Sequence, residues 1–223
     1  MPSAETELTE VIDGVRASHA RLAATLAALT DEQARGASGL PGWTVGHVLT
    51  HIARNADAFV RLLSAAQIGD AVTQYEGGSE ARAAAIEAGS GRPADELVAD
   101  VLASSERLEQ KYAEMTPEGW AGHGLTPDGG TWPCVVMPFH RWREVEVHHV
   151  DLRLGYTATD WPADYVAREL VVALEGLPRR LDTAGQQALV AWLVGRAPMP
   201  DEIELAAWDP RRSDSLRLLS PTG

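Results

Sequence analysis

Two segments of this 223-residue sequence carry side chains that could hold a metal ion. In one of them, Glu144 and His148 are four residues apart, so on a helix they project from the same face, one turn apart. A carboxylate and an imidazole at that spacing can bind one divalent cation without distorting the backbone. Such pairs also arise by chance on charged helices, so the spacing alone does not separate a metal site from a surface Glu–His pair.

The other segment contains His47, His51 and Asn55, which form a polar stripe beside an apolar one. In a helical bundle, a polar stripe at the edge of the core would line a wet interior site. Either histidine would complete a set of two imidazoles and one carboxylate, and catalytic zinc typically takes three protein ligands and leaves a fourth position open. In the alternative interpretation His47 caps the start of the helix and His51 is a hydrogen-bonded core histidine. The spacing leaves both interpretations open.

Apolar periodicity predicts the helices that would position these side chains. They are expected at residues 5–29, from 45 to beyond 63, 79–88, 93–116, 139–154, 163–182 and 185–194. Thr44 and Ser79 are the expected N-caps of the second and third of them. Residues 119–138 are rich in Gly, Pro and Thr and are predicted to form a long loop with a hairpin around residues 128–130.

This pattern predicts a mainly α fold, a four-helix bundle with a small α/β piece at the C-terminus. We expect a helical domain at residues 1–160 and a small C-terminal region at 161–223. Two short strands are predicted in that region, at residues 203–208 and 216–219.

The composition excludes several classes of partner. The formal net charge is −13, from 19 Lys and Arg against 32 Asp and Glu, and such a surface repels nucleic acid and anionic lipid. No apolar run approaches the ~18 residues of a membrane span, and the acidic, amphipathic start does not resemble a signal peptide. Cys134 is the only cysteine, so we expect a reducing, cytoplasmic protein.

Three motifs then suggest a family. They are Gly42-Trp-Thr-x-x-His47-x-x-x-His51, Ser79-Glu-Ala-Arg82 with Ile86, and Arg143-Glu144-Val-x-x-His148-x-Val-Asp151-Leu152. With these, the chain resembles the mycothiol-dependent maleylpyruvate isomerases, within the DinB-like four-helix metal proteins. The resemblance extends in order and similar spacing to about residue 182, and the second and third motifs together are fairly specific.

The resemblance implies a metal site and a set of anion-binding arginines. The implied metal ligands are His51, Glu144 and His148, which favours His51 over His47, and the implied metal is zinc or another divalent ion. Arg82, Arg143 and Arg196 are the candidate catalytic residues, expected to bind substrate carboxylates because a guanidinium pairs with a carboxylate through two N–H groups. The resemblance also implies a C-terminal domain with several strands, and we expect this region to be shortened after Leu181 in this chain.

The implied reaction is the cis–trans isomerisation of maleylpyruvate, or of a similar conjugated dioxo-diacid, to fumarylpyruvate. The thiolate of mycothiol would add to an alkene carbon, allow rotation and leave again. The expected partners are therefore a small anionic substrate and a low-molecular-weight thiol, and we expect a monomer or a small homo-oligomer. Cys134 lies in an apolar stretch with no adjacent positive residue and is expected to be inert.

Several side chains near the predicted ligands have open roles. His140 shares a face with Glu144 and is expected to line the site rather than bind metal. Asp151 would accept the second N–H of His148, or else lies on the helix surface. His149 is expected to be structural. The tryptophans expected to wall the site are Trp43, Trp132 and Trp142.

Two other functions fit the same residues. A mycothiol S-transferase would attach the thiol to other electrophiles and accumulate adducts, whereas an isomerase regenerates free thiol at each turnover. A non-catalytic, metal-binding regulatory module would have a saturated metal and an exposed apolar patch.

Overall fold

Four long helices form the first part of the chain. The structure, a computed structural model, describes residues 4–126, 130–200 and 205. The chain divides into two compact units, Met1–Trp161 and Pro162–Gly223. The long helices of the first unit are α1 (Ala4–Leu26), α3 (Val45–Gln67), α5 (Ala94–Glu114) and α7 (Met137–Asp151).

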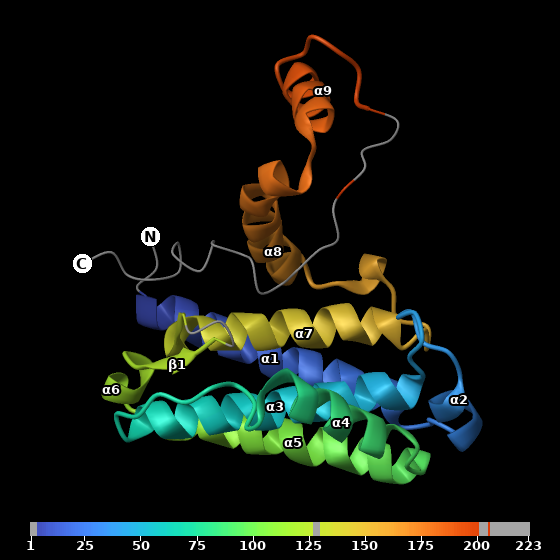
Figure 1. Ribbon diagram of the computed structural model, residues 1–223, viewed down its shortest axis with the longest axis vertical. Coiled ribbons are helices and arrows are strands. Elements are labelled where there is room, and N and C mark those ends of the chain that lie inside the picture. Colours follow the sequence, from blue (N-terminus) through green and yellow to red (C-terminus); the bar gives the residue numbers. More distant parts are fainter. Residues whose placement is uncertain (1–3, 127–129, 201–204, 206–223) are drawn as a thin grey trace. The chain divides into compact units, whose positions relative to one another are not determined.

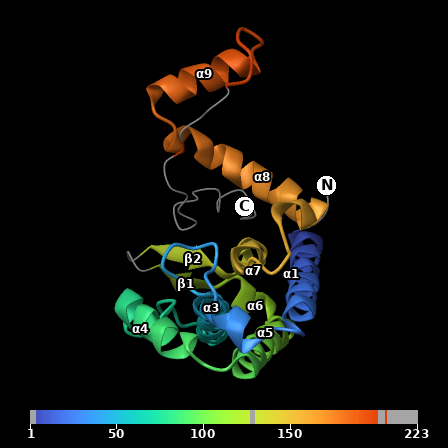
Figure 2. The same cartoon turned by 90° about the vertical axis from the view of Figure 1, so that its right-hand side faces the viewer.

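These helices pack as a four-helix bundle, which is seen nearly end-on in Figure 2. Helix α3 packs against α5 and α7, and α1 packs against α7 and α5. Figure 1 shows them running along one another for most of their length. The prediction of a mainly α fold built on a four-helix bundle is confirmed.

The apolar stripes of the helices form the bundle core. Leu49 and Ile52 of α3, Leu97 and Val101 of α5, and Val145 of α7 are almost fully buried in one cluster. Burying a side chain of this size contributes about 1.5–3 kcal/mol relative to leaving it exposed. This shared apolar surface fixes α3 against α7, the two helices that carry the predicted ligands.

Local signals set the ends of α3 and α7. Thr44 is the N-cap of α3, as predicted: its Oγ1 accepts a hydrogen bond from the backbone N–H of His47 at 3.3 Å. Helix α7 has Pro138 in its first turn, where proline needs no backbone donor. The helix predicted to extend to residue 154 ends at Asp151, because Arg153 has a left-handed backbone with φ 56°.

Helix α4 (Gly78–Ser90) packs against α3 and carries Arg82. The prediction that Ser79 caps it is wrong. The chain enters the helix through Gly77 and Gly78, whose φ angles of 76° and 74° favour glycine, so Ser79 is already inside the first turn. The two helices approach closely at Gly46, where a Cβ would collide with the carbonyl oxygen of Ser90.

The predicted long loop at 119–138 is wrong, because short elements occupy most of it. They are α6 (Pro117–Trp120), β1 (His123–Leu125), β2 (Thr131–Pro133) and η1 (Cys134–Val136). Strands β1 and β2 are antiparallel, with Gly124 opposite Trp132. The predicted hairpin is present, although its turn, residues 127–129, lies outside the described residues.

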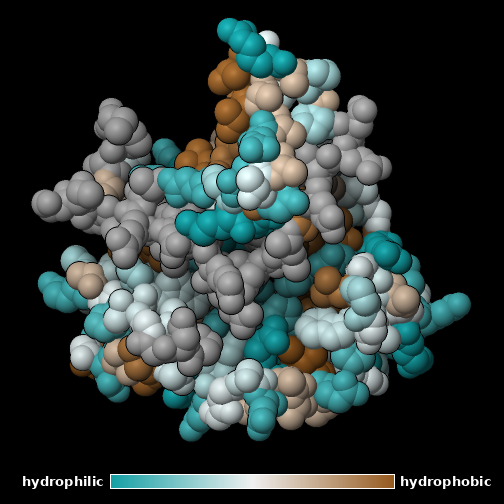
Figure 3. Space-filling model, turned by 45° about the horizontal axis from the view of Figure 1, so that its top comes forward, coloured by the Kyte–Doolittle hydropathy of each residue, from teal (hydrophilic) through white to brown (hydrophobic). Residues whose placement is uncertain are grey.

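The second unit is helical where it is described. It contains α8 (Ala163–Gly176), η3 (Leu177–Arg180) and α9 (Thr183–Leu193). The first unit has two further short elements, α2 (Asp31–Arg35) and η2 (Ala158–Asp160). Helices α8 and α9 both expose large apolar side chains, among them Leu170, Leu174, Val190 and Leu193. Figure 3 colours the surface by hydropathy and shows exposed hydrophobic residues in brown. The strands predicted at 203–208 and 216–219 lie outside the described residues, apart from residue 205. Across the described part of the chain, no helix has both the length and the apolar character that crossing a membrane requires.

Candidate metal centre

Helices α3 and α7 bring the three predicted ligands together. The Nε2 atom of His51 lies 3.0 Å from Oε2 of Glu144 and 3.1 Å from Nε2 of His148. The distance between Nε2 of His148 and Oε2 of Glu144 is 3.5 Å. Among the described residues, these side chains form the group of three whose ligand atoms lie close enough to share one ion.

The spacing of these three atoms suits a small divalent cation. Ligands bound tetrahedrally at 2.0–2.1 Å are separated from one another by about 3.3 Å, and ligands on one face of an octahedron by about 2.9 Å. The observed distances of 3.0, 3.1 and 3.5 Å lie within a few tenths of an ångström of these values. The donor set therefore fits zinc as well as other first-row metals that accept two imidazoles and a carboxylate.

A second layer of polar contacts orients the two imidazoles. Oδ2 of Asp151 lies 2.8 Å from Nδ1 of His148, which is the contact predicted from their spacing. Such a carboxylate fixes the ring and leaves the opposite nitrogen free for a metal. On the other helix, Nη2 of Arg82 lies 3.0 Å from Nδ1 of His51. Because a guanidinium only donates, Nδ1 of His51 is an acceptor in this arrangement.

The charges of the three donors reflect their burial and their contacts. Burial favours the neutral imidazole of His51 and lowers its pKa. Burial would raise the pKa of Glu144, but hydrogen bonds and charge from both imidazoles outweigh it and hold that pKa well below its usual value. Burial likewise opposes the charging of His148, but hydrogen bonds to Asp151 and Glu144 raise its pKa to about 9. Near neutral pH, His148 therefore keeps its proton in the metal-free protein, and its positive charge faces the carboxylate of Glu144.

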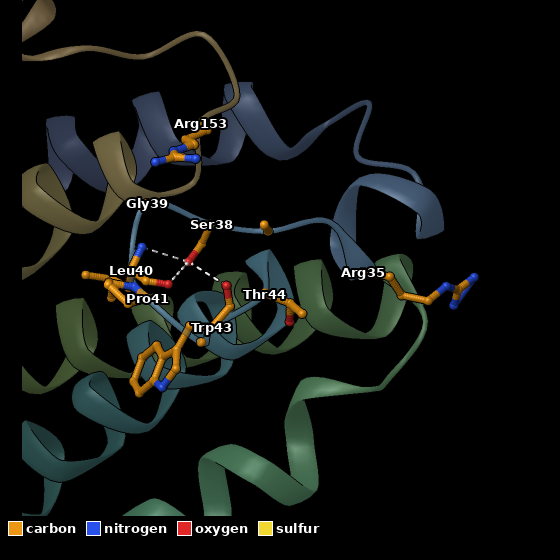
Figure 4. Close-up of a pocket in the computed structure, with 10 residues that line it drawn as sticks. Arg35, Ser38, Gly39, Leu40, Pro41, Trp43, Thr44 and Arg153 are labelled. Carbon is orange, nitrogen blue, oxygen red and sulfur yellow. Dashed lines mark hydrogen bonds between the residues drawn. The ribbon is translucent and has the colours of Figure 1, made fainter.

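A loop between α2 and α3 supports this end of the centre. The backbone N–H of Gly39 donates to the carbonyl oxygen of Asp151 at 2.7 Å, and a Cβ on Gly39 would lie 3.1 Å from Oδ1 of the same residue. Figure 4 shows Ser38 inside the loop, where its hydroxyl bonds Leu40 and the carbonyl oxygen of Trp43. The loop and Arg153 line a cavity of about 430 Å³.

The indole of Trp43 connects this loop to the centre. Its ring meets His51 edge-on at 5.9 Å and stacks on His47 at 6.0 Å. A second cavity, of about 210 Å³, lies between α3 and α4 and is lined in part by Tyr75 and Arg82. Neither of these two cavities is lined by the three donors themselves, but each shares a wall residue with their surroundings.

Comparisons with known proteins identify the family of this chain. The profile of a family described as the mycothiol maleylpyruvate isomerase N-terminal domain matches residues 15–153, more than half of the chain. The chain belongs to this family. A crystal structure of the mycothiol-dependent maleylpyruvate isomerase matches with a TM-score of 0.76 and 24% identity, over 93% of this chain and 100% of that one. A histidine-to-alanine mutant of that isomerase matches with a TM-score of 0.74 at the same identity and coverage. A search of curated proteins finds no match.

In this member of the mycothiol maleylpyruvate isomerase family, the other two predicted arginines have surroundings of their own. Arg143 is buried on α7, with its guanidinium carbon 5.2 Å from the centre of the Phe139 ring. Arg196 is exposed in the second unit, where Nη1 donates to the carbonyl oxygens of Val194 and Gly195. Arg82, by contrast, contacts a predicted ligand, since its Nη2 lies 3.0 Å from Nδ1 of His51.

The remaining histidines have separate roles. His47 completes the N-cap of α3, since its Nδ1 accepts from the backbone N–H of Thr44 at 3.2 Å, so it belongs to the helix start rather than to the donor group. His149 stacks on Tyr156 at 3.8 Å and bonds Thr25, as expected of a structural residue. His140 is buried one turn before the donors and does not join them.

One of the three tryptophans predicted to line the site does not face the candidate metal ligands. Trp142 packs against Gly14 of α1, and its Nε1–H donates to Glu146 at 3.3 Å. It faces α1 because residues 142 and 144 are about 200° apart around a helix. The prediction that it walls the site is therefore wrong.

Two polar residues near the centre were not predicted as part of it. The guanidinium carbon of Arg82 lies 5.6 Å from the centre of the Tyr75 ring, and burial raises the pKa of the Tyr75 hydroxyl. Arg141 is fully buried and donates to Asn55 at 2.9 Å. Tyr75 precedes α4 in an irregular segment, so no periodicity could place it. Arg141 stands in a charged stretch that is typical of a solvent-exposed face.

Cys134 has the environment of an inert thiol. It is fully buried at the start of η1, and burial raises the pKa of its thiol to about 11. A thiol with this pKa carries almost no thiolate near neutrality.

Proposed function

We propose that this chain is a metal-dependent, mycothiol-dependent cis–trans isomerase that acts on maleylpyruvate or a similar conjugated dioxo-diacid. The proposal rests on one observation above all: in a chain of this family, Nε2 of His51, Oε2 of Glu144 and Nε2 of His148 converge within 3.0–3.5 Å. Under this proposal these three atoms would hold zinc or another divalent ion, which three protein ligands leave able to bind a thiol or a substrate oxygen.

The reaction needs two things that the bound groups supply. A divalent metal, when bound, lowers the pKa of a thiol or polarises a substrate oxygen. A low-molecular-weight thiolate, mycothiol in this proposal, makes the double bond single by reversible addition and is released unchanged. The buried, high-pKa thiol of Cys134 is unsuited to that part, which supports the use of an external thiol.

The chain's own residues would bind and orient the substrate. Arg82 is a proposed carboxylate partner, and its Nη2 lies 3.0 Å from Nδ1 of His51. A neutral His51 that ligates through Nε2 carries its proton on Nδ1, and that N–H cannot face the N–H of Arg82. Metal binding would therefore turn Arg82 away from His51 and free its guanidinium for a carboxylate. Arg143 and Arg196 stay as further proposed carboxylate-binding residues.

The helix α3 offers a matched pair of variants to test the proposal. His51→Gln removes a proposed ligand, while His47→Gln changes a histidine one turn earlier and keeps a side chain that can cap the helix. We expect His51→Gln to lose stoichiometric metal and at least a hundredfold in activity, and His47→Gln to retain both. Metal content is measured on the purified proteins.

Activity is measured by the absorbance of maleylpyruvate with and without mycothiol. Turnover that is independent of thiol would contradict the mechanism. Stoichiometric consumption of thiol, with a stable adduct, would instead identify an S-transferase. Full metal content in His51→Gln would remove the ligand assignment.

A further inference from the structure

Two buried N–H groups beside the metal centre have no acceptor in the described part of the chain. His140 is 6% exposed and lies on α7, and its Nε2 atom has no hydrogen-bond partner there. Trp132 of β2 meets the same ring edge-on, with ring centres 4.9 Å apart, and its Nε1 atom also has no partner. Buried donors are nearly always paired, so two neighbouring ones without acceptors indicate a site for a ligand.

The proton of His140 is on the unpartnered nitrogen. Nη1 of Arg143 faces Nδ1 of His140 at 3.5 Å, and a guanidinium can only donate. Nδ1 is therefore the acceptor, and Nε2 carries the hydrogen. Burial and the charge of Arg143 lower the pKa of His140 to about 3, so the ring stays a neutral donor near neutral pH.

These donors lie close to the proposed metal ligands. His140 is one helical turn before Glu144 and shares its face of α7. In Figure 2 the β1–β2 hairpin, which carries Trp132, lies beside α7. A ligand bound by the metal and extending along α7 toward its N-terminus would meet both N–H groups.

The surroundings favour an anion. Two donors without an acceptor repel a cation. Arg141, on the same helix, is fully buried and donates to four uncharged acceptors. These are Nε2 of His19, the carbonyl oxygen of Ile52, Oδ1 of Asn55 and Oγ of Ser105. Its charge has no carboxylate in direct contact among the described residues, and in a poorly solvated interior that charge attracts a negative group.

We propose that Nε2–H of His140 and Nε1–H of Trp132 form a buried subsite that binds one carboxylate of a small anionic substrate beside the metal centre. This inference rests on the proposed function, because it assigns a place to one end of the dicarboxylate. The subsite would hold the carboxylate through two neutral donors. It would thereby fix the substrate relative to the centre while Arg82 is left to bind the other end.

Amide variants of His140 test which nitrogen matters. The amide nitrogen of Gln reaches the position of Nε2, whereas that of Asn reaches the position of Nδ1. We expect maleate to bind zinc-loaded His140→Gln within about threefold of the wild-type affinity. His140→Asn and Trp132→Phe should each bind it about tenfold more weakly, a change of about 1.4 kcal/mol. Trp120→Phe, at a tryptophan on α6, should leave the affinity unchanged. Calorimetry without any thiol gives the affinities.

A measurement on the unaltered side chains covers the case in which a variant fails to fold. The chain has seven tryptophans, and Trp132→Phe identifies the Trp132 indole signal in a ¹H–¹⁵N spectrum. Addition of maleate should move this signal and leave that of Trp120 in place. Equal affinities of His140→Asn and wild type, a Trp132 signal insensitive to maleate, or no binding of maleate would each overturn the subsite. These experiments measure binding and not turnover, so they test the subsite independently of the activity assay. A protein that binds maleate in this way but shows no isomerisation in that assay would refute the proposed function and leave the subsite standing.

Discussion

Removing the carboxylate of Asp151 should weaken zinc binding without touching a ligand. Its Oδ2 lies 2.8 Å from Nδ1 of His148, and a hydrogen bond to a charged group contributes about 1.5–3 kcal/mol, or roughly 10- to 150-fold in affinity. We expect about a hundredfold loss for Asp151→Ala at most. A loss of about tenfold or less is expected for Asp151→Asn, which keeps an acceptor oxygen. The backbone carbonyl of Asp151, which Gly39 bonds, is unchanged in both variants.

The pH of this measurement matters, because the same carboxylate also holds a proton on His148. The pKa of His148 is raised to about 9, so in the metal-free protein zinc must displace this proton at lower pH. At pH 9 the competition changes the affinity by only about twofold, while at pH 7 it costs about a hundredfold in the wild type. Losing Asp151 relieves that competition, so the difference between variant and wild type should narrow as the pH falls from 9 to 7.

Competition with a chromogenic chelator gives the zinc affinities at both pH values. The matched control is Glu87→Ala, because Oε2 of Glu87 lies 3.2 Å from Nε2 of His47 in a similar pair outside the donor group. The control should bind zinc as the wild type does. Wild-type affinity of Asp151→Ala at pH 9, or an equal loss in Glu87→Ala, would refute the reasoning.

Four further predictions concern single residues. Burial lowers the pKa of His19 from 6.5 to about 4, so as the pH falls the unfolded chain binds the proton before the folded chain does. The stability that His19 contributes above pH 6.5 is therefore lost as the pH falls toward 4. In urea titrations, His19→Gln should reduce the loss of unfolding free energy between pH 7 and 4.5 by about 2–3 kcal/mol. An equal pH slope in both proteins would contradict this. Gly39→Ala should weaken zinc binding several-fold, because the added Cβ would press on Asp151, and unchanged affinity would show that the loop yields. Cys134→Ala should keep thiol-dependent turnover, and the native thiol should react with a disulfide reagent only at the rate of unfolding; fast labelling would disprove its burial. Arg82→Met should bind zinc at least as tightly as the wild type, because no guanidinium N–H then faces the proton on Nδ1 of His51. The same variant should bind maleate at least tenfold more weakly, because it lacks the guanidinium that would pair with a carboxylate. Weaker zinc binding in this variant would count against the release of the guanidinium.

The sequence predicted the long helices well because their signals are local. Apolar periodicity gave the bundle helices to within a few residues, and the start of α3 was marked by Thr44. The predicted end of α7 is three residues too late, because no local sequence signal indicates that Arg153 adopts a left-handed backbone. The short elements between 117 and 136 have three or four residues each, which is too short for a helical or a strand periodicity to be recognised.

The ligand pair Glu144 and His148 was visible because both residues lie on one helix. The third donor could not be chosen from spacing, since His47 and His51 lie on the same stripe. The deciding fact is that the ring of His47 is engaged in the N-cap with Thr44. A capping box normally has Glu or Gln at that position, so capping by His47 was one of two open interpretations until its side-chain contacts were seen.

The centre therefore divides into two layers of different origin. The donors come from regular helices whose packing is dictated by buried apolar faces, as with His51 on α3 and Glu144 on α7. The groups around them come largely from irregular segments: Trp43 from the loop before α3, Tyr75 from the segment before α4, and Trp132 from the hairpin. Such segments can change length and sequence at little cost to the bundle core. It follows that proteins with the same three donors should differ in substrate mainly through these segments. Exchanging the hairpin between this chain and a relative should then alter affinity for the anion and leave zinc affinity unchanged.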